Sequence, residues 1–167
     1  MLAVLAADRQ QVLKDAVRLE KDQFSRPPHP GSWSMSELLT HILTTEKLSL
    51  QYMQKKSLGI ATAGNSGVTE SIKMVLMKII QRIPMRYKAP RAVVTNTPPP
   101  LSLEVIGVEW ETFMNDLTAF LQTIDAQHVR RKIYKHPVFG RLDAHQALIS
   151  MHEHFRHHLP QIRRLLK

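Results

Sequence analysis

The sequence predicts an all-α protein, a four-helix bundle with one additional short helix. Apolar residues recur three and four positions apart along almost the whole chain, which is the period of an amphipathic helix. No segment shows the alternation of apolar and polar residues that marks a half-buried strand. With 167 residues, 43% of them hydrophobic, the chain is long enough for one helical domain over residues 1–167 with a continuous core.

The first two helices are separated by a proline-rich break. The first is predicted over about Leu2–Phe24 and ends before residues 26–31, because proline removes a backbone donor and clashes with the preceding turn. The second runs from Ser34 to about Lys56. Ser34 and Glu37 have the spacing of a capping box, in which each side chain satisfies a free backbone N–H, so they mark the start of this helix.

Three further helices complete the bundle. The shorter one is predicted over about Thr69–Ile83, and the proline-containing region Pro84–Pro100 is predicted not to be regular helix. A long helix with a wide apolar face follows over about Leu101–Ile124. After a second irregular stretch, the last helix runs from Asp143, as its N-cap, to about Leu166. Pro160 lies inside it and predicts a bend.

Composition limits the chemistry. There is no cysteine, which excludes a disulfide framework, a thiolate metal site and nucleophilic cysteine catalysis. A metal would therefore be held by imidazole, carboxylate or water. The formal net charge of +9 attracts anions, but the basic residues are scattered and only 6% of the chain is aromatic. A solvated basic surface is the preferred interpretation, attraction of small anionic substrates the second, and a nucleic-acid site the third.

The sequence predicts no association with a membrane. No apolar stretch reaches the roughly 20 residues needed to cross a bilayer. The apolar run at residues 2–7 is short for a signal-peptide core and has no basic segment before it. We therefore expect a cytoplasmic protein.

The candidate metal ligands are three histidines on inner helix faces: His41, His154 and His158. The last two are four residues apart, so their side chains leave the same face of the last helix, one turn from each other. His41 lies on the inner stripe of the second helix, where Thr45 leaves space for a metal or substrate. A buried imidazole without partners costs a few kcal/mol, and metal coordination by one nitrogen with a hydrogen bond from the other removes that cost.

Other interpretations of the histidines stay open at this point. A single inward histidine is more often a satisfied core residue than a ligand, and His152 is the main alternative for the third ligand. His157 is predicted on the solvated side of the last helix, together with Glu153. His136 is interpreted as a loop or surface residue that could border a cleft.

Two segments resemble the DinB/YfiT-like superfamily. Residues 31–42, Gly-Ser-Trp-Ser-Met-Ser-Glu-Leu-Leu-Thr-His-Ile, resemble the family's Trp-Ser turn before the helix that carries the first metal histidine. Residues 136–142, His-Pro-Val-Phe-Gly-Arg-Leu, and 154–162, His-Phe-Arg-His-His-Leu-Pro-Gln-Ile, resemble its final segment, an HP-x-FG-x-L approach followed by an H-x-x-x-H pair. Pro160 departs from the family pattern.

The resemblance implies a fold, a site and a range of activities. The family fold is a four-helix bundle in up-down-down-up order, and His41, His154 and His158 take the places of its three metal ligands. Zinc or nickel is the usual metal, and many members form dimers, so we expect a homodimer. Characterised members include transferases and isomerases that use low-molecular-weight thiols.

A three-histidine site is typical of catalytic metals, because it leaves the divalent ion at least one open coordination position. A water there has its pKa lowered towards about 7, and a bound thiol is deprotonated. The leading hypothesis is a metal-dependent enzyme for a small-molecule substrate: a thiol-dependent transferase, favoured by a basic surface that attracts an anionic thiol, or a hydrolase. The alternatives are a non-enzymatic binding or stress-response bundle and, less favoured, a nucleic-acid-binding bundle. No catalytic residue is assigned, since capping explains Glu37.

Overall fold

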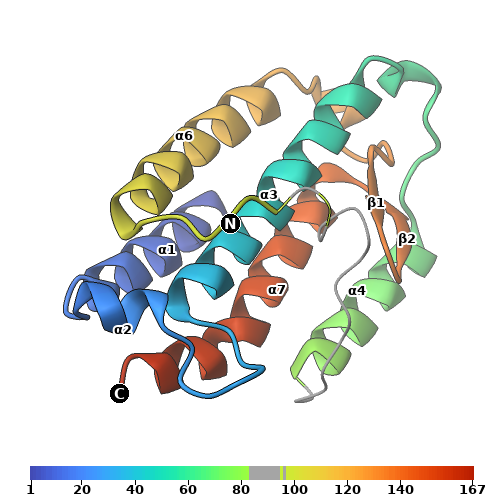
Figure 1. The fold of residues 1–167 in the computed structure, drawn as a ribbon. Coiled ribbons are helices and arrows are strands. Elements are labelled where there is room, and N and C mark those ends of the chain that lie inside the picture. The colour runs from blue at the N-terminus through green and yellow to red at the C-terminus, as the bar shows by residue number, and fades with distance from the viewer. Residues whose placement is uncertain (83–94, 96) are drawn as a thin grey trace.

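Four helices form the bundle in the computed structural model, which describes residues 1–82, 95 and 97–167 (Figure 1). They are α1 (Leu2–Ala16), α3 (Met35–Ser57), α6 (Leu103–Gln122) and α7 (Ala144–Leu165). α1 and α7 run in one direction and α3 and α6 in the opposite one, which is the up-down-down-up order. The additional helix predicted by the sequence is α4 (Val68–Arg82), which packs against α7. Most of the region Pro84–Pro100 lies outside the described residues.

The first predicted helix is in fact two helices. α1 ends at Ala16, and the short helix α2 (Lys21–Ser25) follows after a turn. The backbone N–H of Glu20 donates to Oε1 of Gln23 at 3.1 Å, as part of a capping box at the start of α2. The prediction of one helix to Phe24 was wrong because this second capping signal gives free backbone groups a partner inside the helical pattern. Phe24 is nevertheless buried in the core.

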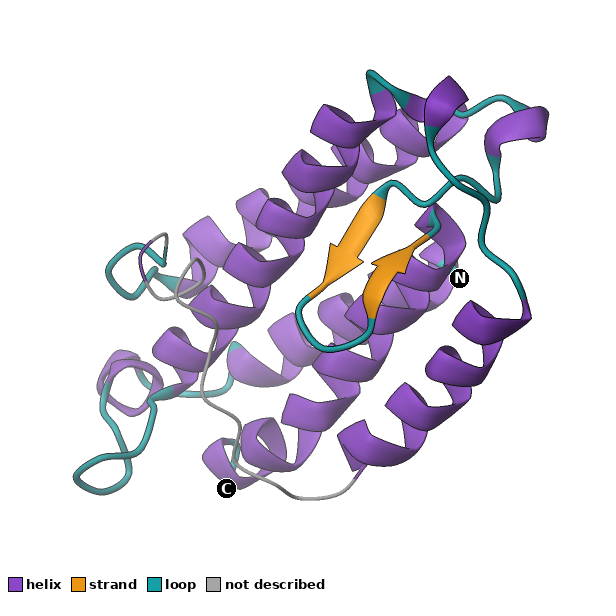
Figure 2. Cartoon of the chain, turned by 90° about the vertical axis from the view of Figure 1, so that its right-hand side faces the viewer, coloured by secondary structure: helices purple, strands orange, loops and turns teal. Residues whose placement is uncertain are grey.

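A short hairpin is the second difference from the prediction, which contained no strand. β1 (Tyr134–His136) pairs antiparallel with β2 (Gly140–Leu142) on the outside of the helices (Figure 2), and β1 contacts both α3 and α7. Gly140 has a φ of +76°, which glycine adopts without steric cost. Strands of three residues are too short for an alternating pattern to be recognised, so sequence reasoning missed them. Two 3₁₀ turns, η1 (Ile60–Thr62) and η2 (Ala126–His128), lie in the loops.

Both predicted N-caps are confirmed. The backbone N–H of Glu37 donates to Oγ of Ser34 at 3.2 Å, and the backbone N–H of Ser34 donates to Oε2 of Glu37 at 2.7 Å. At the start of α7, the backbone N–H of Gln146 donates to Oδ1 of Asp143 at 2.8 Å. The two caps define where α3 and α7 begin. No helix in the described ranges is long and apolar enough to cross a membrane.

A buried ion pair links the helices at the centre of the bundle. Arg9 on α1 and Glu46 on α3 are 2% and 1% exposed, and the guanidinium group of Arg9 donates to both carboxylate oxygens of Glu46. Nε1 of Trp110 on α6 donates to Oε2 of Glu46 at 3.0 Å. The guanidinium carbon of Arg9 lies 4.9 Å from the ring centroid of Phe155 on α7. Burial raises the pKa of the Glu46 carboxyl, and the charge and hydrogen bonds of Arg9 oppose that rise.

The replacement Glu46→Ala should destabilise the fold by about 3–5 kcal/mol, because it leaves the Arg9 charge buried without a partner. Urea unfolding followed by circular dichroism measures the loss. The neighbouring pair Lys47–Glu109 is the control, since both side chains are about 40% exposed, and Lys47→Ala should cost less than about 1 kcal/mol. Equal losses in the two variants would contradict a structural role for the buried pair.

Candidate metal centre

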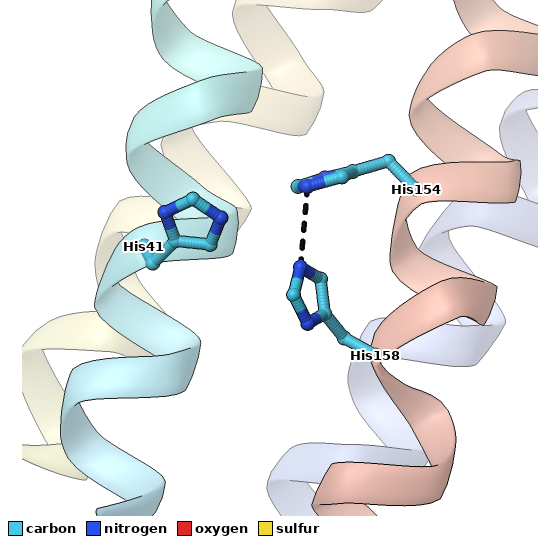
Figure 3. Close-up of side chains that lie close together, drawn as sticks. All are labelled: His41, His154 and His158. Atoms are coloured by element: carbon cyan, nitrogen blue, oxygen red, sulfur yellow. Dashed lines mark hydrogen bonds between the residues drawn. The ribbon is translucent and has the colours of Figure 1, made fainter. Parts of the chain in front are cut away.

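Three imidazole rings meet between α3 and α7 (Figure 3). His41 projects from α3, and His154 and His158 project towards it from successive turns of α7. The ring centroid of His41 lies 5.5 Å from that of His154 and 5.3 Å from that of His158. One nitrogen from each ring lies within 4.8 Å of the other two. The structure therefore brings together the three histidines that the sequence singles out.

Apolar burial sets the rotation of α7 that turns the histidine pair inwards. Met151, Phe155 and Ile162 are all buried in the core. Met151 and Ile162 lie one turn before His154 and one turn after His158, so the pair shares the buried side of the helix. Pro160 lies within the same helix, which continues to Leu165. The amphipathic pattern of α7 thus orients the pair towards α3.

Hydrogen bonds fix which nitrogen carries the proton on each ring of the α7 pair. Nδ1 of His158 lies 2.7 Å from Oε1 of Gln161, and an amide oxygen only accepts, so Nδ1 is the protonated nitrogen. The hydroxyl of Thr45 donates to the carbonyl oxygen of Ile42 at 2.7 Å. Its oxygen can then accept from Nδ1 of His154 at 3.4 Å. These contacts favour a proton on Nδ1 and an unprotonated Nε2 in both rings.

The two unprotonated Nε2 atoms face each other at 3.2 Å, along the dashed line in Figure 3. Neither has a proton to donate, so the two lone pairs repel unless a cation lies between them. A tetrahedral ion with metal–nitrogen bonds of about 2.0–2.1 Å separates its ligand nitrogens by about 3.3 Å. The separation of the pair and the neutral nitrogen donors therefore fit a divalent ion.

Burial keeps all three imidazoles neutral at physiological pH. Burial first and the nearby His158 second lower the pKa of His41 to about 4. Burial also lowers the pKa of His158 to about 4, against the hydrogen bond to Gln161. The pKa of His154 lies well below its usual value, because of burial first and the neighbouring histidines second. Neutral imidazole is the form that binds metal.

Two predictions about the other histidines of α7 need correction. His152, the alternative third ligand, is outside the cluster, with Nε2 3.2 Å from Oδ2 of Asp8 on α1. Glu153, predicted on the solvated side with His157, is buried. His157 is half-buried, and its Nδ1 lies 2.9 Å from the carbonyl oxygen of Gln81 on α4. The prediction failed because no pattern within α7 indicates that α4 packs against this helix.

Sequence reasoning also missed the roles of the groups around the cluster. Gln161 hydrogen-bonds His158. Its position one turn after a candidate ligand is the signal that could have predicted this contact. Trp33 lies beside the site, with its ring centroid 4.9 Å from that of His41, and is 41% exposed. It therefore forms an outer wall of the site. The other tryptophan, Trp110, is buried and donates a hydrogen bond to Glu46.

Comparison with known proteins gives one match. The family model described as DinB superfamily matches residues 5–162, a range that contains all three histidines. Neither the curated proteins nor the solved structures that were searched gave a match.

The lowered pKa values predict a pH-dependent stability for the metal-free protein. The unfolded chain binds protons on these histidines below about pH 6.5, whereas the folded protein binds them only near pH 4 or lower. The free energy of unfolding should therefore fall as the pH is lowered from about 6.5 towards 4. Urea unfolding at pH 7, 6 and 5 measures the slope. His154→Ala should flatten this slope, whereas the control His145→Ala, at an exposed position, should leave it unchanged. Identical slopes in the wild type and both variants would contradict the assignment of the slope to the buried histidines.

Proposed function

Because the chain belongs to the DinB superfamily, we propose that it binds one divalent metal ion, zinc or nickel, through His41, His154 and His158. The observation that carries the proposal is the 3.2 Å separation of the two Nε2 atoms, in rings whose Nδ1 atoms each face a hydrogen-bond acceptor. In a protein that binds no metal here, a hydrogen-bond donor facing one of these nitrogens would stabilise the fold. Here the hydrogen bonds of Gln161 and Thr45 hold the ring protons on the far side of each ring.

We further propose that the site is that of a metal-dependent enzyme for a small-molecule substrate. A divalent ion held by three neutral imidazoles keeps its full charge and an open position, and it lowers the pKa of a bound water or thiol. Gln161 and Thr45 orient the histidine lone pairs, and Trp33 lines the outer edge. The formal charge of +9 favours an anionic ligand. These features support a thiol-dependent transferase as the first choice and a hydrolase as the second.

A non-enzymatic binding or stress-response bundle is the alternative. It is supported by Glu37, the carboxylate one turn before His41, because this side chain caps α3 and needs no catalytic role to explain it. The nucleic-acid alternative is less favoured, because two of the three basic residues at 130–132 donate to carbonyl groups of this chain's own backbone. Arg130 and Arg131 donate to the carbonyl oxygens of Ser66 and Ala63. A homodimer stays a prediction.

Metal content tests the ligand assignment. The purified protein should hold about one zinc or nickel ion per chain, and each of His41→Ala, His154→Ala and His158→Ala should lose most of it, because two imidazoles bind far more weakly than three. His152→Ala is the matched control on the same helix, since its ring pairs with Asp8 instead. Elemental analysis after dialysis gives the values. A metal-free wild type, or variants that keep their metal, would contradict the proposal.

Cobalt substitution separates the enzyme from the binding protein. In the transferase, mercaptosuccinate, a small anionic thiol, should bind cobalt directly and produce an intense near-ultraviolet thiolate-to-cobalt absorption band. The physical reason is that an open position beside three neutral ligands deprotonates and accepts a thiol. A spectrum that does not change at millimolar thiol, in protein that contains cobalt, would favour the non-enzymatic bundle or the hydrolase.

A further inference from the structure

The face of β1 that carries His136 lies against the helices of the histidine cluster. Tyr134 and His136 are two residues apart in the strand, so their side chains leave the same face. Tyr134 is buried, and its hydroxyl lies 3.3 Å from Oγ of Ser49 on α3. Ser49 donates to the carbonyl oxygen of Thr45 at 2.7 Å, so the tyrosine hydroxyl is the donor to Ser49. This contact fixes the inward face of the strand.

The inward face lies one helical turn from the cluster. Ser49 follows Thr45 by four residues on α3, and Thr45 contacts Nδ1 of His154. His136 follows Tyr134 along the strand, and the two ring centroids are 6.5 Å apart. A positive charge on His136 would lower the pKa of His154, so the two rings are near each other. The imidazole of His136 therefore lies near the candidate metal centre.

The hairpin fixes the tautomer of His136. The backbone N–H groups of Val138 and Phe139 donate to its Nδ1 at 3.1 and 3.2 Å. A nitrogen that accepts these bonds carries no proton, so the proton of the neutral ring is on Nε2. Burial lowers the pKa of His136 to about 4, which keeps the ring neutral. Within the described residues, Nε2 of His136 makes no hydrogen bond.

His154, His158 and His136 thus divide into two kinds of group. Nε2 of His154 and Nε2 of His158 face each other, whereas the hairpin leaves the proton of the neutral His136 ring on Nε2. The first kind binds a cation, and the second binds an atom with a lone pair. A neutral donor also avoids the repulsion that a second positive charge would exert on a divalent ion.

We propose that His136 donates a hydrogen bond from Nε2 to the acceptor atom of a small anionic ligand bound at the histidine cluster. His136 is then a specificity-determining residue, which favours anions over neutral ligands. This inference rests on the proposed metal site and extends it from the ion to the ligand. The ring of Phe139, with its centroid 5.0 Å from that of His136, helps to hold the donor in place.

The variant His136→Asn separates the donor from the structural role of the side chain. Asparagine can still accept a hydrogen bond from the N–H two residues on, as in an Asx turn, but it is too short to place a donor where Nε2 lies. The probe is azide, titrated into cobalt-loaded protein and followed in the visible spectrum. The Kd for azide should rise about tenfold or more, because a hydrogen bond to a charged ligand is lost. Cobalt affinity and urea stability should stay close to wild type.

His145→Asn makes the same replacement at an exposed position in the first turn of α7 and should change none of these values. An unchanged azide Kd in cobalt-loaded His136→Asn would overturn the inference and leave the metal site intact. A parallel loss of cobalt affinity would also overturn it, because the residue would then be structural. A wild type that binds no cobalt would refute the proposed function, and the inference with it.

A measurement on the wild-type protein does not depend on how the variant folds. In zinc-loaded protein, saturating azide should slow the exchange of the His136 Nε2 proton with water, so that its NMR signal becomes visible. An Nε2 proton that exchanges equally fast with and without azide, under conditions where azide binds, would overturn the inference.

Discussion

The contact between Arg9 and Glu46 is the interaction on which the arrangement of the bundle depends. Two charges with almost no exposure to water are tolerated only where each has a partner in the right place. The carboxylate of Glu46 also accepts from Trp110, and the guanidinium of Arg9 lies over Phe155. One polar group of atoms thus connects α1, α3, α6 and α7. A shift of α1 or α3 by one turn would leave a buried charge unpaired.

The position of the candidate metal centre follows from this arrangement. Phe155, which contacts Arg9, lies on α7 between His154 and His158, and Glu46 lies on the same helix as His41. The ion pair joins α1 to α3, and the contact of Arg9 with Phe155 extends it to α7, so the same side chains help to align the two helices that carry the three imidazoles. The capping boxes at Ser34 and Asp143 define the ends from which both helices begin. The contacts that pack the core therefore also help to determine the geometry of the site.

The site is built from neutral groups whose protons are held in place. Each ring of the α7 pair uses Nδ1 for a hydrogen bond and keeps Nε2 unprotonated, while the hairpin imposes the opposite tautomer on His136. Imidazole can serve as acceptor or donor without changing its charge. A cluster of histidines can therefore provide metal ligands and a ligand-binding donor side by side, provided that the surrounding structure decides each tautomer.

The helical class, the starts of α3 and α7, and the pairing of His154 with His158 were all predictable from the sequence. These features are local, because capping and the spacing of four residues act within one helix. The same local reasoning failed for the break after Ala16 and for the three-residue strands, where the periodic signal is too short to detect. Tertiary contacts alone place His41 opposite this pair, bury Glu153 on the helix that α4 packs against and bring His136 near the cluster. Each of these depends on contacts between residues far apart in the chain, which no pattern within a single helix or strand specifies.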